Sequence, residues 1–299
     1  MSSVIQQDLS IIIVNWNTKN ELRACLSSLY SKPSELALEV IVVDNASSDG
    51  SADMVEQEYP QVILIRNSEN VGYARANNLG IRRSSSQNVL LLNSDTIVNP
   101  DVMKETLELL RSDSKIGVLG CKLIGTDGKI QESFNHQYPF GPTVGNPGTI
   151  PEDGLVECAL VWGAYMMVKR EAIDQVGMLD DDFFMFYEDV EWCWRMYDAG
   201  WKIVYDTNHS IKHLCRASCG QVKPRDIDQY LFISEKIMYK KRLPYPRYKV
   251  WWRKRFLYHI RCIAWYSLLS MITRSEYSRY RVRHHLDGYR ILTSSKAGG

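Results

Sequence analysis

Three acidic side chains follow a run of aromatic and apolar residues in the second half of the chain. Residues 183–187 (FFMFY) lead directly into Glu188, Asp189 and Glu191. Apolar surroundings disfavour a charged carboxylate, and neighbouring carboxylates raise the pKa of one another. Acids placed in this way are candidates for a general base that removes a proton near neutral pH. The segment is therefore the first candidate for a catalytic centre.

The same acids can also be explained as the start of a helix. Glu188 and Asp189 would complement the positive end of the helix, and Glu191 would pair with Arg195 one turn later. Asp189, however, shares a helical face with three apolar residues, Trp192, Cys193 and Met196. A carboxylate on an apolar face needs a reason. We therefore interpret Glu191 and Arg195 as structural and Asp189 as functional.

Strands and helices are expected to alternate through the first part of the chain. Short apolar runs predict strands that are buried on both faces of a parallel sheet, joined by right-handed crossovers. The expected strands are 9–14, 40–43, 62–65 and 89–92, and the expected helices are 21–30, 52–58, 74–83 and 101–111. Residues 122–157 are rich in Gly and Pro and predict a long loop or hairpin. Further elements are expected at 159–168 (strand), 169–176 and 190–199 (helices) and 202–205 (strand).

Polar side chains gather where three of the expected strands end. Asn15 and Asn17 follow the first strand, Asp44 ends the second, and Asn93 and Asp95 follow the fourth. Ligands of open α/β sheets bind at the carboxyl ends of the strands, so these residues predict one site. An aspartate there can accept a hydrogen bond from a ribose or a base, and another can hold a hard cation that bridges phosphates. Neither a Walker A loop nor a GxGxxG sequence is present, so phosphate binding by a Gly-rich turn is not expected.

Six segments of the chain resemble, in the same order, those of glycosyltransferase family 2. They read SIIIVNWNT, VIVVDNASSDGS, NVGYARANNLGI, LLLNSDT, WGAYMMVKR and FFMFYEDVEWCWR, and the resemblance extends over residues 9–218. The bacterial rhamnosyltransferase-like branch is the most similar in these segments. The resemblance implies a GT-A type α/β fold, in which a mostly parallel nucleotide-binding sheet is flanked by helices. It also implies an inverting enzyme that uses a nucleotide sugar.

The resemblance further implies roles for the residues at matching positions. Asp189 would be the catalytic base, with Glu188 beside it, and Mg²⁺ or Mn²⁺ would bind Asp95 and His213. Asn93 stands where the family's DxD motif has its first acid, which removes one negative charge and predicts modest metal affinity. The donor side would comprise Asn15, Asn17, Asp44, Arg75, Asn78, Asn93 and Asp95, and the acceptor side Trp162, Gly163 and Ala164.

Several of these residues also have simpler explanations. Trp162 can be a core residue, Arg75 a helix-surface residue and His213 an ordinary histidine. A zinc cluster is a further alternative for His213, but its four members are crowded into eleven residues without a second CxxC-like pair: His209, His213, Cys215 and Cys219.

Charge is distributed unevenly along the chain. Residues 236–290 contain 15 Lys and Arg against two acids, a balance of +13, whereas the remainder contains 21 against 33, a balance of −12. Within residues 250–271, apolar and aromatic residues alternate with basic ones, which predicts a basic amphipathic helix. The longest uncharged stretch of this region, residues 262–273, has 12 residues, fewer than the ~20 that span a bilayer. Such a helix suits an anionic membrane surface; the alternative is a helix that packs on its own domain.

These observations predict two domains, residues 1–230 with the GT-A fold and residues 231–299 with a basic, helical, membrane-associating tail. The resemblance implies an inverting glycosyltransferase that moves L-rhamnose from dTDP-L-rhamnose to a lipid-linked glycan in surface polysaccharide biosynthesis, and the basic tail supports an acceptor at the membrane. Seven scattered cysteines and a polar N-terminus predict a cytoplasmic protein at the inner face of the membrane.

Other functions remain as alternatives. They are a UDP-hexose-dependent transferase of the same family, a non-catalytic relative that binds a nucleotide or glycan, and a nucleotidyltransferase. A nucleic-acid partner is not expected, because it would explain the basic tail but not the acidic strand ends. The oligomeric state is left open, a homodimer included.

Overall fold

The computed structural model describes residues 7–139, 141–147, 154–214 and 223–294. Contacts divide the chain into two units. Unit 1 comprises Met1–Asp181 and Glu188–Gly220, and unit 2 comprises Asp182–Tyr187 and Gln221–Gly299. The division at residue 220 lies upstream of the expected boundary at 230. It also assigns to unit 2 the short aromatic segment that precedes the acid pair.

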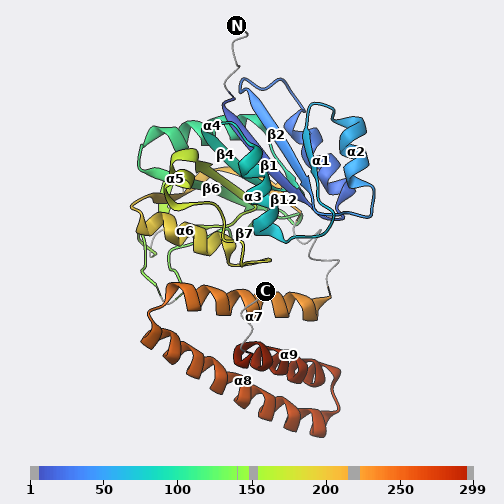
Figure 1. Cartoon of the computed structure of the whole chain (residues 1–299), viewed down its shortest axis with the longest axis vertical. Helices are drawn as coiled ribbons and strands as arrows, with labels where there is room; N and C mark the ends of the chain where they lie inside the picture. Colours follow the sequence, from blue (N-terminus) through green and yellow to red (C-terminus); the bar gives the residue numbers. More distant parts are fainter. Residues whose placement is uncertain (1–6, 140, 148–153, 215–222, 295–299) are drawn as a thin grey trace. The chain divides into compact units, whose positions relative to one another are not determined.

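A mostly parallel sheet forms the centre of unit 1 (Figure 1). Its strands are β1 (Leu9–Asn15), β2 (Leu38–Asp44), β3 (Ile63–Arg66), β4 (Asn88–Asn93), β5 (Thr96–Ile97), β6 (Ile116–Ile124), β7 (Ile130–Gln131), β9 (Leu155–Cys158), β11 (Tyr165–Lys169) and β12 (Lys202–His213). The order is β3-β2-β1-β4-β11-β6-β12-β5, with β7 paired to β6 and β9 paired to β12. Strands β1 to β4 pair in parallel, as do β6 and β12, whereas β11 is antiparallel to both of its neighbours. Strands β8 (Phe134–Asn135) and β10 (Leu160–Val161) pair separately.

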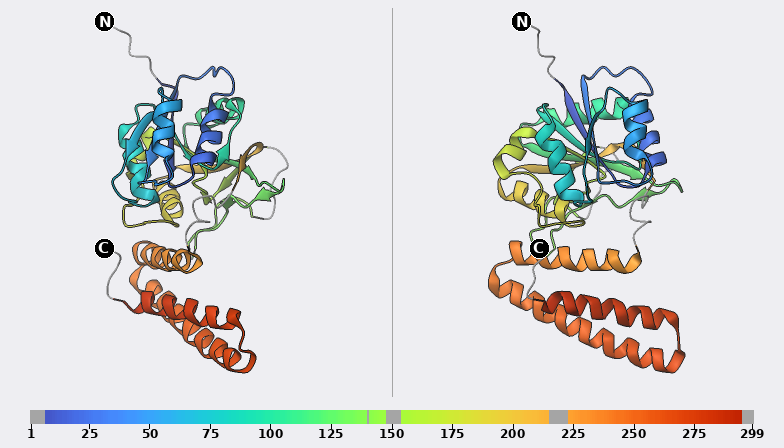
Figure 2. Two further views of the ribbon diagram at one scale, coloured as in Figure 1. Left: turned by 90° about the vertical axis from the view of Figure 1, so that its right-hand side faces the viewer. Right: turned by 45° about the vertical axis from the view of Figure 1, so that its right-hand side comes forward.

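Helices cover both faces of this sheet (Figures 1 and 2). On one face, α1 (Lys19–Leu29), α2 (Ser51–Glu58) and α4 (Pro100–Ser112) bury their apolar sides in one core with Ile11 and Ile13. On the other face, α3 (Tyr73–Arg83) packs on Ile41 and Val43. A Cβ on Gly80 would come within 2.4 Å of Ile12, so only glycine allows α3 to lie this close to β1. Strand side chains alternate between the faces, which explains why the apolar runs are continuous.

The expected pairs of strand and helix up to residue 112 are confirmed, as are helices α5 (Arg170–Val176) and α6 (Glu188–Asp198). Strand β6 was not expected, because Gly117 and Gly120 interrupt its apolar pattern. A Cβ on Gly120 would lie 2.7 Å from Val161, so a close approach between chain segments requires this glycine. The prediction of a single loop or hairpin at 122–157 was incomplete, since the segment also contains β8 and β9. Strand β12 runs on to His213 because its polar half alternates between buried and exposed positions.

Unit 2 contains the helices α7 (Pro224–Arg242), α8 (Tyr245–Thr273) and α9 (Glu276–Thr293), and α8 and α9 lie side by side (Figure 2). Tyr239, Trp251 and Leu292 form its apolar core, one residue from each helix. Ion pairs join α7 to its neighbours, Arg225 to Asp287 at 2.6 Å and Glu235 to Arg255 at 2.7 Å. Among the described residues, none of the helices combines the length and the apolar character that crossing a membrane requires.

A histidine cluster lies inside this bundle. Nδ1 of His259 in α8 and Nδ1 of His285 in α9 are 3.3 Å apart, and both side chains are buried. His284 contacts Asp228 of α7 at 2.7 Å. A Cβ on Gly288 would come within 2.3 Å of the His259 ring, so this glycine lets the two helices approach. Burial, reinforced by neighbouring cationic side chains, lowers the pKa of His259 and of His285 to about 4.

Acid should therefore destabilise unit 2. An unfolded histidine titrates near pH 6.5, so between about pH 6.5 and the folded pKa the unfolded state binds more protons. The stabilising effect is complete above about pH 6.5 and is lost as the pH falls towards the folded pKa. We expect calorimetry to show a Tm that falls between about pH 7 and about pH 5, and a smaller fall in His285→Gln. An equal fall in the variant and the parent would contradict this explanation.

Candidate active site

The strand ends that the sequence singles out meet at one edge of the sheet. Asn15 and Asp44 are register partners on β1 and β2, and both are buried. Nδ2 of Asn15 donates to Oδ1 of Asp44 at 3.0 Å and to Oγ of Ser47 at 3.1 Å. The backbone N–H of Ser47 donates to the other oxygen of Asp44 at 3.0 Å. The Asp44 carboxylate is therefore fixed in place by the loop that follows its own strand.

Asn17 connects the same two loops. Its backbone N–H donates to Oγ of Ser47 at 2.9 Å, and its Oδ1 accepts from the backbone N–H of Ser48 at 2.7 Å. Asn17 has a left-handed backbone, with φ 53°, which asparagine tolerates better than most residues. Asn15, Asn17 and Asp44 thus form one continuous polar wall, as predicted from their positions after the strands.

Asp95 and His213 lie close together where β4 ends and β5 begins. Strand β12 runs antiparallel to β5 and pairs His213 with Thr96, so the histidine reaches the residue just before β5. Nε2 of His213 lies 3.4 Å from Oδ1 of Asp95 and also 3.4 Å from Nδ2 of Asn93. Both Asp95 and His213 are largely buried.

Gln131 holds the ring of His213 in its orientation. Its Nε2 donates to the backbone carbonyl of His213 at 3.0 Å, which turns its Oε1 towards Nδ1 of the ring at 2.7 Å. Nδ1 must then carry a hydrogen, and Nε2 is the ring nitrogen that faces Asp95. A histidine that donates its second N–H to a carbonyl oxygen is the usual arrangement of a metal ligand.

Asp95 and His213 together fit a divalent metal that arrives with further ligands. Within the described parts of the chain, no group of three or more His, Cys, Asp or Glu side chains is placed to hold a metal ion. Mg²⁺ and similar cations bind through one or two carboxylates and complete their shell with substrate phosphates and water. The donor set therefore suits a metal that is shared with a diphosphate.

The acid pair occupies the first turn of α6. Glu188 is 6% exposed, and its Oε2 has no hydrogen-bond partner among the described residues. Asp189 is half-buried, and its two oxygens accept from the backbone N–H groups of Gly163 at 3.2 Å and Val190 at 2.8 Å.

The pKa values of the two acids respond differently to their surroundings. Burial raises the pKa of Glu188 well above its usual range, and the charge of Asp189 raises it further. Burial also raises the pKa of Asp189, but the N–H groups of Gly163 and Val190 oppose this rise. Burial thus favours the neutral form of Glu188, whereas the two N–H groups favour the charged form of Asp189.

Backbone strain lies immediately before this pair. Phe186 and Tyr187 both have left-handed backbones, with φ 69° and 68°, which costs about 1–2 kcal/mol for each residue. Contacts within unit 2 hold the segment, since Ser234 donates to the carbonyl of Met185 at 2.7 Å and Phe184 stacks on Tyr230. Such strain is concentrated at functional sites.

Tyr73, the first residue of α3, connects Gly163, the partner of Asp189, with Asn93, the neighbour of His213. Its hydroxyl lies 2.9 Å from the carbonyl oxygen of Gly163 and 3.2 Å from Oδ1 of Asn93. A Cβ on Gly163 would lie 3.0 Å from this hydroxyl, so the contact favours glycine. Burial raises the pKa of Tyr73, and Glu188, Asp189 and Asp95 raise it further. The sequence-based prediction omitted Tyr73, although it stands inside the segment that supplied Arg75 and Asn78.

Arg75 and Asn78 brace the segment that leads towards α6. Nδ2 of Asn78 donates to the carbonyl of Leu179 and to Oδ1 of Asp181, both at 2.7 Å, and its Oδ1 accepts from the N–H of Leu179. Nε of Arg75 donates to the carbonyl of Asp181 at 3.0 Å. A contact of either side chain with a donor sugar stays a prediction, and for Asn78 it would require these bonds to break.

The predicted acceptor residues are Gly163, whose N–H group binds Asp189, and its two neighbours, Trp162 and Ala164. Gly163 supplies the N–H group, Ala164 is buried, and the side chain of Trp162 is 40% exposed, so Trp162 is not a core residue. Their position follows from β11, which is antiparallel to β4 and therefore begins at the edge where β4 ends. Contact with an acceptor stays a prediction.

Two further predictions concern structural roles. Glu191 pairs with Arg195 at 2.7 Å, which confirms the structural interpretation of both residues. His209, the first member of the alternative zinc cluster, pairs instead with Glu105 at 2.8 Å and with Asp206. Cys215 and Cys219 lie outside the described residues.

The mostly parallel sheet, flanked by helices and with polar residues at its strand ends, has a GT-A-like fold. A comparison of the sequence with family models identifies the family. Residues 10–177 match the model of Glycosyl transferase family 2, and the chain belongs to this family. It is 30% identical over 195 residues to the low-salt glycan biosynthesis hexosyltransferase Agl10 of Haloferax volcanii, covering 63% of this chain and 61% of that relative. It is 28% identical over 274 residues to the N-acetylglucosaminyl-diphospho-decaprenol L-rhamnosyltransferase of Mycobacterium tuberculosis, covering 82% and 86%.

Solved structures share the fold. The mannosyltransferase PcManGT from Pyrobaculum calidifontis, in complex with GDP-Man and Mn²⁺, aligns with a TM-score of 0.59 at 14% identity, over 98% of this chain and 89% of that one. S. aureus TarS 1–349, in complex with UDP, aligns with a TM-score of 0.55 at 15% identity, over 95% and 90%. The predictions of the family and of the GT-A fold are confirmed.

Loss of the Tyr73 hydroxyl should impair sugar transfer more than folding. Tyr73→Phe leaves buried acceptors on Gly163 and Asn93 with one donor fewer, which costs about 1–3 kcal/mol. Because Gly163 also positions Asp189, we expect kcat to fall while the KM for the donor changes little. Tyr59→Phe, which removes a hydroxyl bonded to Ser27 at 2.8 Å, is the matched control. Equal kcat values for the Tyr73 variant and the parent would refute a positioning role.

Proposed function

We propose that the protein is an inverting glycosyltransferase that moves L-rhamnose from dTDP-L-rhamnose to a hydroxyl group of a lipid-linked glycan. The observation that carries the proposal is the placement of Asp189, held by Gly163 at 3.2 Å in a site that also contains Asp44 and the pair Asp95 and His213. The choice of sugar and acceptor is supported by the printed name of the Mycobacterium relative, which aligns over most of both chains. The site and the resemblance thus point to the same class of reaction.

The polar wall at β1 and β2 would bind the nucleoside. The Asp44 carboxylate is buried and fixed by Asn15 and Ser47, so it can accept hydrogen bonds from a ribose or base without reorganising. Preorganised polar groups of this kind bind a ligand at a lower entropic cost.

Asp189 would act as the general base. Its carboxylate accepts the proton of the acceptor hydroxyl while the hydroxyl oxygen bonds to the anomeric carbon. The bond from that carbon to the diphosphate oxygen breaks, and the nucleoside diphosphate leaves with the electron pair. One displacement inverts the anomeric configuration, and the raised pKa of Asp189 makes its carboxylate a better base near neutral pH.

Asp95 and His213 would hold Mg²⁺ or Mn²⁺. Bound there, the cation would neutralise the negative charge that develops on the leaving diphosphate. Gln131 orients the histidine for this purpose, and Asn93 contributes a neutral amide where a second acid would stand.

The basic unit 2 supports a location at the cytoplasmic face of the membrane, where lipid-linked glycans would be accessible. A UDP-hexose donor is the second candidate, because the Haloferax relative is named a hexosyltransferase. A non-catalytic relative is disfavoured, since the acid pair and its N–H donors are intact.

Asp189→Asn should separate binding from catalysis. An amide cannot accept the proton, so we expect transfer to fall by about a thousandfold or more. The affinity for the donor should change by less than about twofold, because Asp189 makes no contribution to ground-state binding in this mechanism. Asp174→Asn, an exposed change on α5, is the control. Retained turnover in Asp189→Asn would remove this residue from the role of base.

Calorimetric titration with dTDP and UDP, each with and without Mn²⁺, tests the donor and the metal. We expect dTDP to bind more tightly than UDP, and only with Mn²⁺, and Asp95→Ala to lose the effect of the metal. Preference for UDP would move the donor to a UDP-sugar and leave the class of reaction unchanged. Binding of neither nucleotide would refute the proposal of a nucleotide-sugar transferase, and an unchanged metal effect in Asp95→Ala would refute this metal site.

A further inference from the structure

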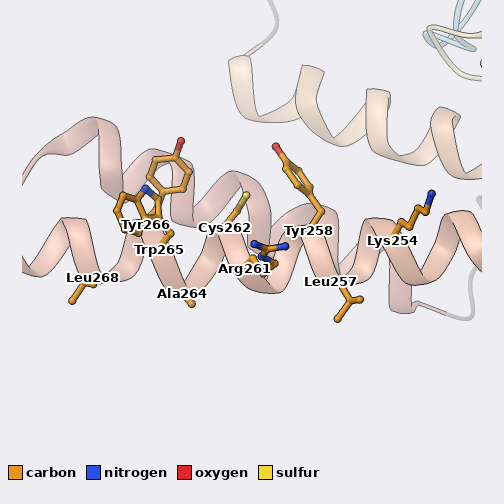
Figure 3. Close-up of a pocket in the computed structure, with 9 residues that line it drawn as sticks. All are labelled: Lys254, Leu257, Tyr258, Arg261, Cys262, Ala264, Trp265, Tyr266 and Leu268. Atoms are coloured by element: carbon orange, nitrogen blue, oxygen red, sulfur yellow. The ribbon is translucent and has the colours of Figure 1, made fainter.

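One face of α8 carries apolar side chains that are exposed. They recur in steps of one, three and five residues, are between 42% and 72% exposed, and comprise Leu257, Ile260, Trp265, Leu268, Met271 and Ile272. Steps of this kind place residues on one side of a helix. Figure 3 shows Leu257, Ala264 and Leu268 on the same side of α8, opposite Tyr258 and Tyr266.

The opposite face of α8 is the one that packs within unit 2. Trp251 belongs to the apolar core of the bundle, and His259 lies against His285 of α9. The helix therefore buries one side and leaves a second apolar side uncovered. Large exposed apolar patches are rare on soluble domains and mark interaction surfaces.

Positive charge accompanies the apolar side chains. Lys254 and Arg261 stand three residues before and four residues after Leu257, and both are exposed. The whole of α8 contains six Lys and Arg and neither Asp nor Glu. A partner for this face must therefore accept apolar and aromatic side chains and also carry negative charge.

We propose that the face of α8 from Lys254 to Ile272 lies in the interface of an anionic membrane. The aliphatic side chains and Trp265 would enter the boundary between headgroups and acyl chains, and Lys254 and Arg261 would reach the phosphates. Each basic residue near an anionic surface adds to the attraction, and the interface suits a helix that lies along the membrane. The inference deepens the membrane location named in the proposed function and rests on it for the choice of lipid as partner.

Sedimentation of the full-length protein with lipid vesicles tests this face. The vesicles would contain phosphatidylcholine alone or with phosphatidylglycerol, at low and at high salt. We expect binding only with the anionic lipid, and weaker binding at high salt, because salt screens exposed charges. Trp265→Glu combined with Leu268→Glu should weaken binding by at least about tenfold, the effect of failing to bury one large apolar side chain.

Matched controls separate this face from the rest of the surface. Arg261→Glu should also weaken binding, whereas Arg83→Glu and Ile130→Glu, which change exposed residues of unit 1, should leave it unchanged. Circular dichroism would check that the helices persist. Trp265→Ser with Leu268→Ser is the second pair if the glutamates disturb α8.

Vesicle binding needs neither donor nor metal, so this inference can fail while sugar transfer stands. Equal binding of the parent and both α8 pairs would overturn it, as would binding that is indifferent to phosphatidylglycerol. Failure of the unmodified protein to bind any of the vesicles would also overturn the inference. If ultracentrifugation shows a dimer that the Trp265 and Leu268 changes dissociate, the face belongs to a second copy of the chain and not to lipid.

Discussion

Two adjacent carboxyl groups at the start of α6 compete for charge, and the rest of the site is arranged around this pair. Glu188 is buried without a partner for one of its oxygens among the described residues, and burial together with the charge of Asp189 raises the pKa of Glu188. The N–H groups of Gly163 and Val190 point at Asp189 and favour its charged form. The placement of Gly163 therefore affects the charge of Asp189, and Gly163 is held by its position before β11 and by Tyr73.

Strand direction explains how these groups reach one edge. Parallel strands bring Asn15, Asp44 and Asn93 there by their carboxyl ends. Strand β11 is antiparallel to β4, so its beginning, with Gly163 just before it, lies at the same edge. His213 arrives through the long β12, which pairs with β5 next to Asp95. The polar groups of the candidate site thus meet at one edge because one interior strand of the sheet is reversed.

The sequence predicts the parts of this arrangement that depend on local pattern. Apolar runs indicate β1 to β4, and polar residues after them indicate Asn15 and Asp44. Tyr73 and Gln131 were not predicted, because their roles arise from contacts over 20 or more residues, to Asn93 and His213. The bracing role of Asn78 was not predicted either, since its partners, Leu179 and Asp181, lie about a hundred residues away.

The neutral side chain at position 93 is explained by the charges around it. Burial and the charges of Asp189 and Asp95 already raise the pKa of the Tyr73 hydroxyl. An aspartate in place of the half-buried Asn93 would set a further carboxylate 3.2 Å from that hydroxyl and beside Asp95, and neighbouring carboxylates disfavour the charged form of one another. The amide instead reaches Nε2 of His213 at 3.4 Å. With an amide at position 93, the site offers a divalent metal one carboxylate fewer. Oxygens of the diphosphate would then have to supply the remaining negative charge, so metal and donor would bind together.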